Sequence, residues 1–279
     1  MEPKRLSLFV AYIKCGSPSQ SVLDTHGEYH NMLIEMLNSM ASTLEWGEVN
    51  IDGLGFDATK GFLPNSGTID AFDAVVVTGS SYSAYDNNPW VTKLGIYEEK
   101  PKIRLFGSCF GHQMICKALF KPSPLQPDLP PHTPVVFRNP KGWELGVHPI
   151  ELSPEFMARF GPVLSNPNSP PHMRLRLIHQ DNVNPDSLPD DFINVGRSEG
   201  CQVQGVYEKG RVLTLQGNPE FDKKVMVEFG KPIIEKGHID TVKSGPDDYG
   251  YTARAILGFF LEDADEKVTD EVAEGTAAE

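Results

Sequence analysis

Long apolar runs, cysteines and basic residues are all scarce in this sequence. No stretch approaches the roughly 18 apolar residues of a transmembrane helix, so we expect no membrane span. The apolar segment near the start, Leu6–Ile13, is short and lacks a small-residue cleavage site, so we expect no signal peptide. The four cysteines are widely spaced and show no zinc-ligand pattern: Cys15, Cys109, Cys116 and Cys201. This usage predicts a reduced, cytoplasmic protein without a metal or another cofactor.

Acidic residues outnumber basic ones, with 38 Asp and Glu against 25 Lys and Arg, and the formal net charge is −13. Because nucleic-acid binding requires clustered Lys and Arg, we expect no nucleic acid as a partner. Eight of the acids lie in Glu262–Glu279, together with one lysine and few large apolar residues. That composition predicts a disordered, solubilising tail over residues 263–279 rather than a docking segment. We expect the remaining residues, 1–262, to form one domain.

Apolar and amphipathic segments alternate along the chain, and 39% of the residues are hydrophobic. We expect buried strands at Leu6–Ile13, Ala71–Val77, Ile103–Phe106 and Arg211–Leu215. We expect helices at His26–Met40, Lys223–Glu235 and Tyr251–Leu261. We expect loops at Ser17–Thr25, Asp52–Thr68 and His179–Val183. This alternation predicts an α/β fold with a mostly parallel central sheet flanked by helices.

The segment Gly107-Ser108-Cys109-Phe110-Gly111 has a cysteine with glycines two residues before and two residues after it. This spacing, between an apolar strand and a helix-favouring segment, is typical of a sharp nucleophile elbow, where larger flanking side chains would clash. The helix would point its N-terminus at Cys109, and its dipole would favour the thiolate over the thiol. The alternative is a buried cysteine that packs as a small hydrophobe beside a glycine turn.

Two further segments carry a resemblance to a known family. His112 and Gln113 follow the second glycine, and Gly-x-Cys-x-Gly-His-Gln resembles the elbow of class I glutamine amidotransferases and their amidase relatives. The segment Thr78–Asp86, TGSSYSAYD, is similar to a subgroup that includes gamma-glutamyl peptidases and fungal amidotransferase-like proteins. The resemblance spans about residues 6–235, and it implies the flavodoxin-like fold of that superfamily.

The resemblance also implies a mechanism. Cys109 would attack the carboxamide of glutamine or of a gamma-glutamyl group, and a histidine would accept the thiol proton and pass it to the leaving amine. Glu220 would orient that histidine. Oxyanion stabilisation and substrate binding are implied for Gly79, Ser80, Phe110 and Gln113. The expected ligand is therefore a small molecule with an amide or acyl group.

The histidine is missing from its expected place. The family pattern Gln-Gly-His-Pro-Glu is replaced by Gln216-Gly217-Asn218-Pro219-Glu220, so Asn218 stands where the general base belongs. An amide side chain does not titrate near neutral pH and cannot carry a proton. Because losing general-base assistance typically costs about two to four orders of magnitude in rate, the sequence predicts impaired glutaminase activity.

Three explanations of Asn218 remain open. In the first, His179 acts as a substitute base, although a structural role for this histidine is the alternative. In the second, the pocket is repurposed for another reaction in specialised metabolism, such as a cyclisation, an elimination or an acyl transfer. In the third, the chain is a non-catalytic protein that binds a ligand or partner. An engineered change from histidine to asparagine would leave the same sequence.

Two further expectations concern the surroundings of the elbow. His112 is expected to be structural, because an elbow turns the residues after Phe110 into the helix. No synthetase domain accompanies the amidotransferase-like domain, and the sequence identifies no partner chain that would use released ammonia.

Overall fold

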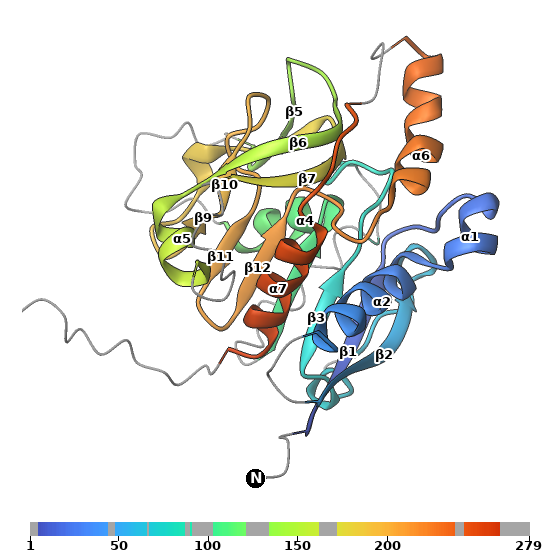
Figure 1. The fold of residues 1–279 in the computed structure, drawn as a ribbon, viewed down its shortest axis with the longest axis vertical. Coiled ribbons are helices and arrows are strands. Elements are labelled where there is room, and N and C mark those ends of the chain that lie inside the picture. Colours follow the sequence, from blue (N-terminus) through green and yellow to red (C-terminus); the bar gives the residue numbers. More distant parts are fainter. Residues whose placement is uncertain are drawn as a thin grey trace, which may run out of the picture.

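Seven strands form the central sheet of the computed structural model, which describes residues 5–43, 48–65, 67–86, 90, 103–120, 134–161, 172–237 and 243–262. In spatial order they are β2 (Glu48–Asp57), β1 (Arg5–Lys14), β3 (Ala74–Val77), β4 (Arg104–Ser108), β12 (Val212–Leu215), β11 (Val206–Glu208) and β9 (Ile193–Asn194). The first five strands run parallel, whereas β11 is antiparallel to both of its neighbours. The expected α/β fold with a mostly parallel central sheet is therefore confirmed (Figure 1).

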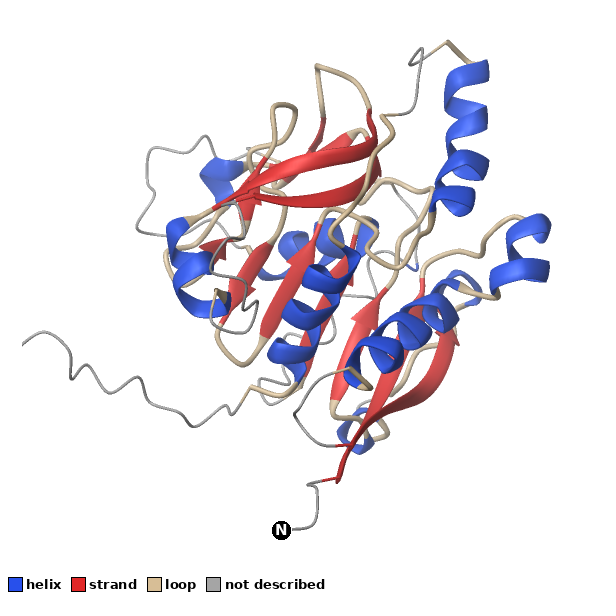
Figure 2. Cartoon of the chain, viewed as in Figure 1, coloured by secondary structure: helices blue, strands red, loops and turns tan. Residues whose placement is uncertain are grey.

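Helices cover both faces of this sheet (Figure 2). On one face, α2 (Tyr29–Ala41) and α7 (Tyr249–Phe260) contribute apolar side chains to a core cluster shared with β1, β3 and β4. On the other face, α4 (Phe110–Leu119) packs into a second cluster. Every residue of β3 and β12 is buried, as expected for parallel strands that are covered on both faces.

Two smaller sheets lie beside the central one (Figure 1). The larger of them consists of antiparallel strands β10 (Gly196–Arg197), β6 (Glu144–Leu152) and β7 (His172–His179). In the other, β5 (Val136–Arg138) pairs with β8 (Asp181–Val183). Buried and part-buried residues alternate along β7, so the adjacent side chains of Ile178 and His179 point to opposite sides of the strand.

The helix α6 (Lys223–Glu235) lies near the ends of β1 and β3, above α1 and α2 in Figure 1. It begins after Asp222, whose Oδ1 accepts a hydrogen bond from the backbone N–H of Val225 at 2.8 Å. α6 shares a third apolar cluster with α1 and α2. The remaining described helices are α1 (Gln20–His26), α5 (Pro154–Phe160), and the short 3-10 turns η1 (Ala58–Lys60), η2 (Ile69–Ala71) and η4 (Pro185–Ser187).

Three expected loops contain regular structure. Ser17–Thr25 includes most of α1, because Val22 packs into the apolar cluster of α6 despite its polar neighbours. Asp52–Thr68 includes the second half of β2, which pairs with β1 along its whole length. Finally, His179–Val183 includes β8, which pairs with β5. In all three cases, tertiary pairing or packing outweighs a polar or glycine-rich composition.

The expected helix at His26–Met40 is not continuous in the structure. It is divided at Gly27, whose φ of 75° ends α1, so that α2 begins only at Tyr29.

Near the C-terminus, Glu262 is buried and does not belong with the predicted tail. Its carboxylate accepts hydrogen bonds from the Tyr207 hydroxyl at 2.6 Å and from the Gly210 N–H at 2.9 Å. The predicted tail, 263–279, lies outside the described residues. Among the described helices, none combines the length and the apolar character needed to cross a membrane.

Candidate active site

Cys109 lies at a sharp turn between β4 and α4. It is the one described non-glycine residue with a positive φ, at 52°. A Cβ on Gly107 would lie 2.6 Å from the carbonyl carbon of Gly111, and a Cβ on Gly111 would overlap the carbonyl oxygen of Val77. Both flanking glycines are therefore required by close backbone approach, and the sharp strand-to-helix elbow predicted from their spacing is present.

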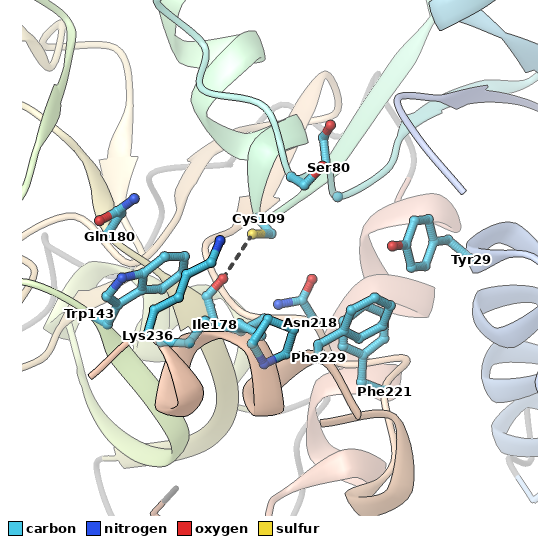
Figure 3. Close-up of a pocket in the computed structure, with 14 residues that line it drawn as sticks. Tyr29, Ser80, Cys109, Trp143, Ile178, Gln180, Asn218, Phe221, Phe229 and Lys236 are labelled. Carbon is cyan, nitrogen blue, oxygen red and sulfur yellow. Dashed lines mark hydrogen bonds between the residues drawn. The ribbon is translucent and has the colours of Figure 1, made fainter. Parts of the chain in front are cut away.

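The Cys109 thiol is largely enclosed, with 6% of the residue exposed. Its Sγ donates to the backbone carbonyl of Ile178 at 3.8 Å (Figure 3). Burial raises the pKa of this thiol to about 12, although the Phe110 N–H at the start of α4 acts in the opposite direction. The start of the helix thus favours the thiolate as expected, but the cost of burying a charge is larger, so the pKa of the thiol is raised overall.

Asn218 follows β12 and lies beside the thiol. Its backbone N–H donates to the carbonyl of Arg176 at 2.8 Å, and the residue is 1% exposed. A Cβ on Gly79 would lie 3.2 Å from the Asn218 Oδ1, while Nδ2 has no hydrogen-bond acceptor among the described residues. The amide helps to lower the pKa of the Cys109 thiol, against the larger effect of burial. Asn218 therefore lies next to the thiol, where its amide can only offer fixed hydrogen bonds.

The carboxylate of Glu220 is buried behind this pair. Its Oε1 accepts a hydrogen bond from the Ser108 hydroxyl at 3.3 Å, whereas Oε2 has no partner among the described residues. Burial raises the pKa of Glu220 to about 7. No nearby positive charge among the described residues contributes to this pKa, so Glu220 lacks the stabilisation that a paired imidazole would give its carboxylate.

His179 and His112 are both held within the protein. The His179 Nε2 lies 3.1 Å from the Glu144 Oε2, and its Nδ1 lies 3.1 Å from the backbone carbonyl of Asp181. This arrangement favours a structural role for His179 over that of a substitute base. The Nδ1 of His112 lies 2.7 Å from the Thr214 hydroxyl, and burial lowers the pKa of His112 to about 3, as suits the expected structural role.

The loop after β3 brings Gly79 and Ser80 to the elbow. A Cβ on Gly79 would lie 3.7 Å from the Cβ of Cys109, so the backbone of this loop is close to the thiol. The Ser80 hydroxyl donates to the Cys15 carbonyl at 2.5 Å and is thereby occupied within the protein. Any contribution of Ser80 to an oxyanion site would therefore come from its backbone N–H.

Asp181 anchors this loop, and the sequence analysis did not single it out. Its carboxylate accepts from the Ser83 hydroxyl at 2.6 Å and from the Tyr85 hydroxyl at 2.9 Å. Its backbone carbonyl accepts from the Nε2 of Gln113 at 3.0 Å, so that side chain, expected at the substrate, makes internal contacts. The position of Asp181 two residues after His179, next to a strand end, was the available sequence signal.

A cavity of about 420 Å³ opens beside the thiol (Figure 3). Besides Cys109 and Asn218, its walls include side chains that the sequence analysis did not select: Tyr29, Trp143, Gln180, Phe221, Phe229 and Lys236. The cavity joins the elbow to the aromatic side chains of α2 and α6. No carboxylate is among its described lining residues. The described residues also contain no cluster of His, Cys, Asp and Glu that would hold a metal ion.

The fold and the elbow define an α/β protein with a cysteine exposed to a cavity at a strand-to-helix turn. The family model for class I glutamine amidotransferases matches residues 22–237, and the chain belongs to that family. It is 27% identical over 270 residues to a glutamine amidotransferase-like protein of Schizosaccharomyces pombe, which covers 91% of this chain and 98% of the relative.

Two further matches agree with this assignment. Gamma-glutamyl peptidase 4 of Arabidopsis thaliana is 25% identical over 244 residues, which cover 85% of this chain and 84% of the relative. The crystal structure of a glutamine amidotransferase from Thermotoga maritima matches with a TM-score of 0.59 at 21% identity, covering 92% of this chain and 99% of that one. At this identity the structural likeness concerns the fold alone.

Proposed function

We propose that this chain binds a small amide, such as glutamine or a gamma-glutamyl compound, and transfers its acyl group through Cys109 with a triad that lacks its histidine. The observation that carries the proposal is the position of Cys109, held at the elbow in the wall of a cavity of about 420 Å³. The relatives named glutamine amidotransferase-like protein and gamma-glutamyl peptidase support the substrate class. The cysteine usage supports a cytoplasmic location.

The proposed step is an acyl transfer to sulfur. The Cys109 Sγ bonds to the amide carbonyl carbon, the C–N bond breaks, and the amine leaves with the proton that the thiol gave up. Water or another nucleophile then cleaves the thioester and returns the proton to sulfur. The N–H groups of Phe110 and of the Gly79–Ser80 segment are the donors we assign to the oxyanion.

The step that this site supports least is removal of the proton from the Cys109 thiol. Asn218 cannot accept the thiol proton, and burial keeps the pKa of the thiol at about 12. Glu220, whose Oε2 has no partner among the described residues and whose pKa is about 7, is the acceptor that we assign. We therefore propose that ordinary glutaminase turnover is slow and that the natural reaction, within specialised metabolism, differs from ammonia supply.

A reversion tests this proposal. We expect Asn218→His to raise turnover of glutamine or of gamma-glutamyl p-nitroanilide by about two to four orders of magnitude, because the imidazole restores general-base catalysis beside Glu220. Adding Cys109→Ala should abolish the gain. If neither the parent nor Asn218→His turns over either compound, the pocket does not accept these amides and the proposal fails.

A second candidate is a binding protein without catalysis. The observation that favours it is the raised pKa of the Cys109 thiol, about 12, together with the internal contacts of both nearby histidines. In that case iodoacetamide should not label Cys109 selectively near neutral pH, and Cys109→Ala should keep full biological activity. Selective labelling at neutral pH would instead indicate an activated thiol and would contradict the binding-only function.

A further inference from the structure

The cavity beside Cys109 has one aromatic side. Tyr29 from α2, Phe221 from the segment before α6, and Phe229 from α6 form what we call the three-ring cluster. Their ring centroids are 5.6 Å apart for Tyr29 and Phe221, 6.0 Å for Tyr29 and Phe229, and 5.4 Å for the stacked pair Phe221 and Phe229. Figure 3 shows the cluster to the right of the thiol, with the Tyr29 hydroxyl directed toward the cavity.

The opposite side of the cavity carries a positive charge, and it includes an amide and one further aromatic side chain, that of Trp143. Figure 3 shows Lys236, Gln180 and Trp143 to the left of the thiol, and all three line the same cavity. Gln180 and Trp143, but no member of the three-ring cluster, also line a smaller cavity of about 70 Å³ next to Cys109. Lys236 makes no ion pair with any residue that the structure describes, and the lining contains no described carboxylate. The charge of the cavity is therefore opposite to that of the chain.

From this division we propose, on the basis of the proposed function, that the site selects gamma-glutamyl amides whose leaving amine carries an aromatic ring. The amide carbonyl lies at Cys109, the carboxylate of the glutamyl half pairs with Lys236, and the ring of the amine half packs on the three-ring cluster. The chemical class is a gamma-glutamyl arylamide, in which the leaving half carries no charge.

Physical chemistry favours this orientation over the reverse one. An aromatic ring on Tyr29, Phe221 and Phe229 gains the free energy of burying apolar surface together with offset or edge-on ring contacts. A carboxylate placed there would lose its hydration without gaining a cation. At Lys236 the same carboxylate keeps an ion pair, and because the side chain of Lys236 is exposed, it reaches the ligand without being desolvated first.

The proposal is tested by binding to the Cys109→Ser protein, which cannot form the thioester. The probes are gamma-glutamyl anilide and gamma-glutamyl ethylamide, which share the glutamyl half and differ only in the amine. We expect calorimetry to show about tenfold tighter binding of the anilide, because its ring buries several more apolar carbons. Equal affinity for the two compounds would overturn the proposal, and so would a failure of both to bind.

Two pairs of variants locate the contacts. Phe229→Ala should weaken the anilide by a much larger factor than the ethylamide and so remove the preference. Val227→Ala, at an exposed position of the same helix that does not line this cavity, should change neither. Lys236→Ala should weaken both ligands by a similar factor, whereas Lys231→Ala, which is exposed and paired with Glu228, should weaken neither. A uniform loss in Phe229→Ala would overturn the assignment of the ring.

This test is independent of turnover. If the two amides bind equally, yet Asn218→His gains Cys109-dependent hydrolysis, the proposed function holds and only the arylamide preference is lost. If the anilide is preferred, yet no variant turns it over, the substrate class holds for a binding site and the proposed catalysis fails.

Discussion

The Nε2 of His179 lies 3.1 Å from the Oε2 of Glu144, and both side chains are buried. Burial alone would raise the pKa of Glu144, but hydrogen bonding to His179, together with Ser198, holds that pKa at about 2. Glu144 also accepts from the Gln204 Nε2 at 3.0 Å. The imidazole is thus one member of a polar network inside the protein.

We predict that His179→Gln lowers stability rather than chemistry. Removing one of these two buried polar groups, which lie 3.1 Å apart, should cost about 3 kcal/mol at pH 7. Because the folded pKa of Glu144 lies below its usual 4.5, the parent loses this stabilisation as the pH falls from about 4.5 to about 2, so the difference should shrink in acid. Urea denaturation at pH 7 and at low pH measures it. In the parent protein, where position 218 is asparagine, a large loss of turnover in His179→Gln without a loss of stability would instead identify His179 as a base.

Glu220 should destabilise the protein at alkaline pH. Its folded pKa of about 7 exceeds the usual 4.5, so the contribution of Glu220 to stability is most favourable below about pH 4.5, where both states hold the proton, and it is lost as the pH rises through 7. The difference between a folded pKa of about 7 and the usual 4.5 corresponds to a loss on the order of 3 kcal/mol in the free energy of unfolding. We expect Glu220→Gln to raise the melting temperature at pH 8 but not at pH 4.5, and Glu235→Gln, on the exposed end of α6, to have no effect. A pH-independent change in Glu220→Gln would contradict the assigned pKa.

Gly111→Ala should disrupt the elbow. A Cβ at this position would overlap the backbone carbonyl oxygen of Val77, which cannot move without shifting β3. We expect a loss of about 3 kcal/mol or more, comparable to other severe overpacking changes. Gly245→Ala is the matched control, because nothing lies within 4 Å of a Cβ there. Chemical denaturation of both variants gives the comparison, and similar stabilities would show that the elbow tolerates the side chain.

Asp181→Asn should loosen the loop that carries Gly79 and Ser80. The change weakens the acceptors for the Ser83 and Tyr85 hydroxyls, each of which now bonds to a buried carboxylate. We expect about 2 kcal/mol of destabilisation and faster alkylation of Cys109, because the loop covers the thiol. Tyr85→Phe removes one of the two bonds and should give a smaller effect of the same sign. Unchanged alkylation in both variants would mean that the loop position does not depend on Asp181.

The parts of the fold with local signals were predictable from the sequence. Hydrophobic runs and periodicity placed β3, β12, α6 and α7 closely, and the two glycines around Cys109 identified the elbow. Signals that depend on distant partners were missed. The second half of β2 exists because it pairs with β1, and the pKa of the Cys109 thiol depends on how many groups exclude water from it.

The binding cavity could not have been predicted in the same way. Tyr29, Trp143 and Phe229 come from three separate regions of the chain, and each reads locally as an ordinary apolar residue of a helix or strand. For His179 the sequence erred in the other direction. Its place after a strand suggested a catalytic role, whereas its ring nitrogens contact Glu144 and the backbone of Asp181. Sequence spacing alone does not distinguish a side chain that lines the cavity from one that contacts buried groups, because the difference depends on residues far away in the chain.

The wall of the cavity that α6 contributes has a consequence for how the sequence of this protein can diverge. Phe229, Pro232, Ile233 and Lys236 are spaced by three and four residues, so they form a single helical stripe. The elbow, by contrast, is built from backbone contacts between β3, β4 and α4. The side chains proposed to select the ligand and the backbone contacts that hold Cys109 therefore lie in separate parts of the chain. A library confined to those four positions would explore new ligands while leaving the cysteine in place, and natural divergence could follow the same route.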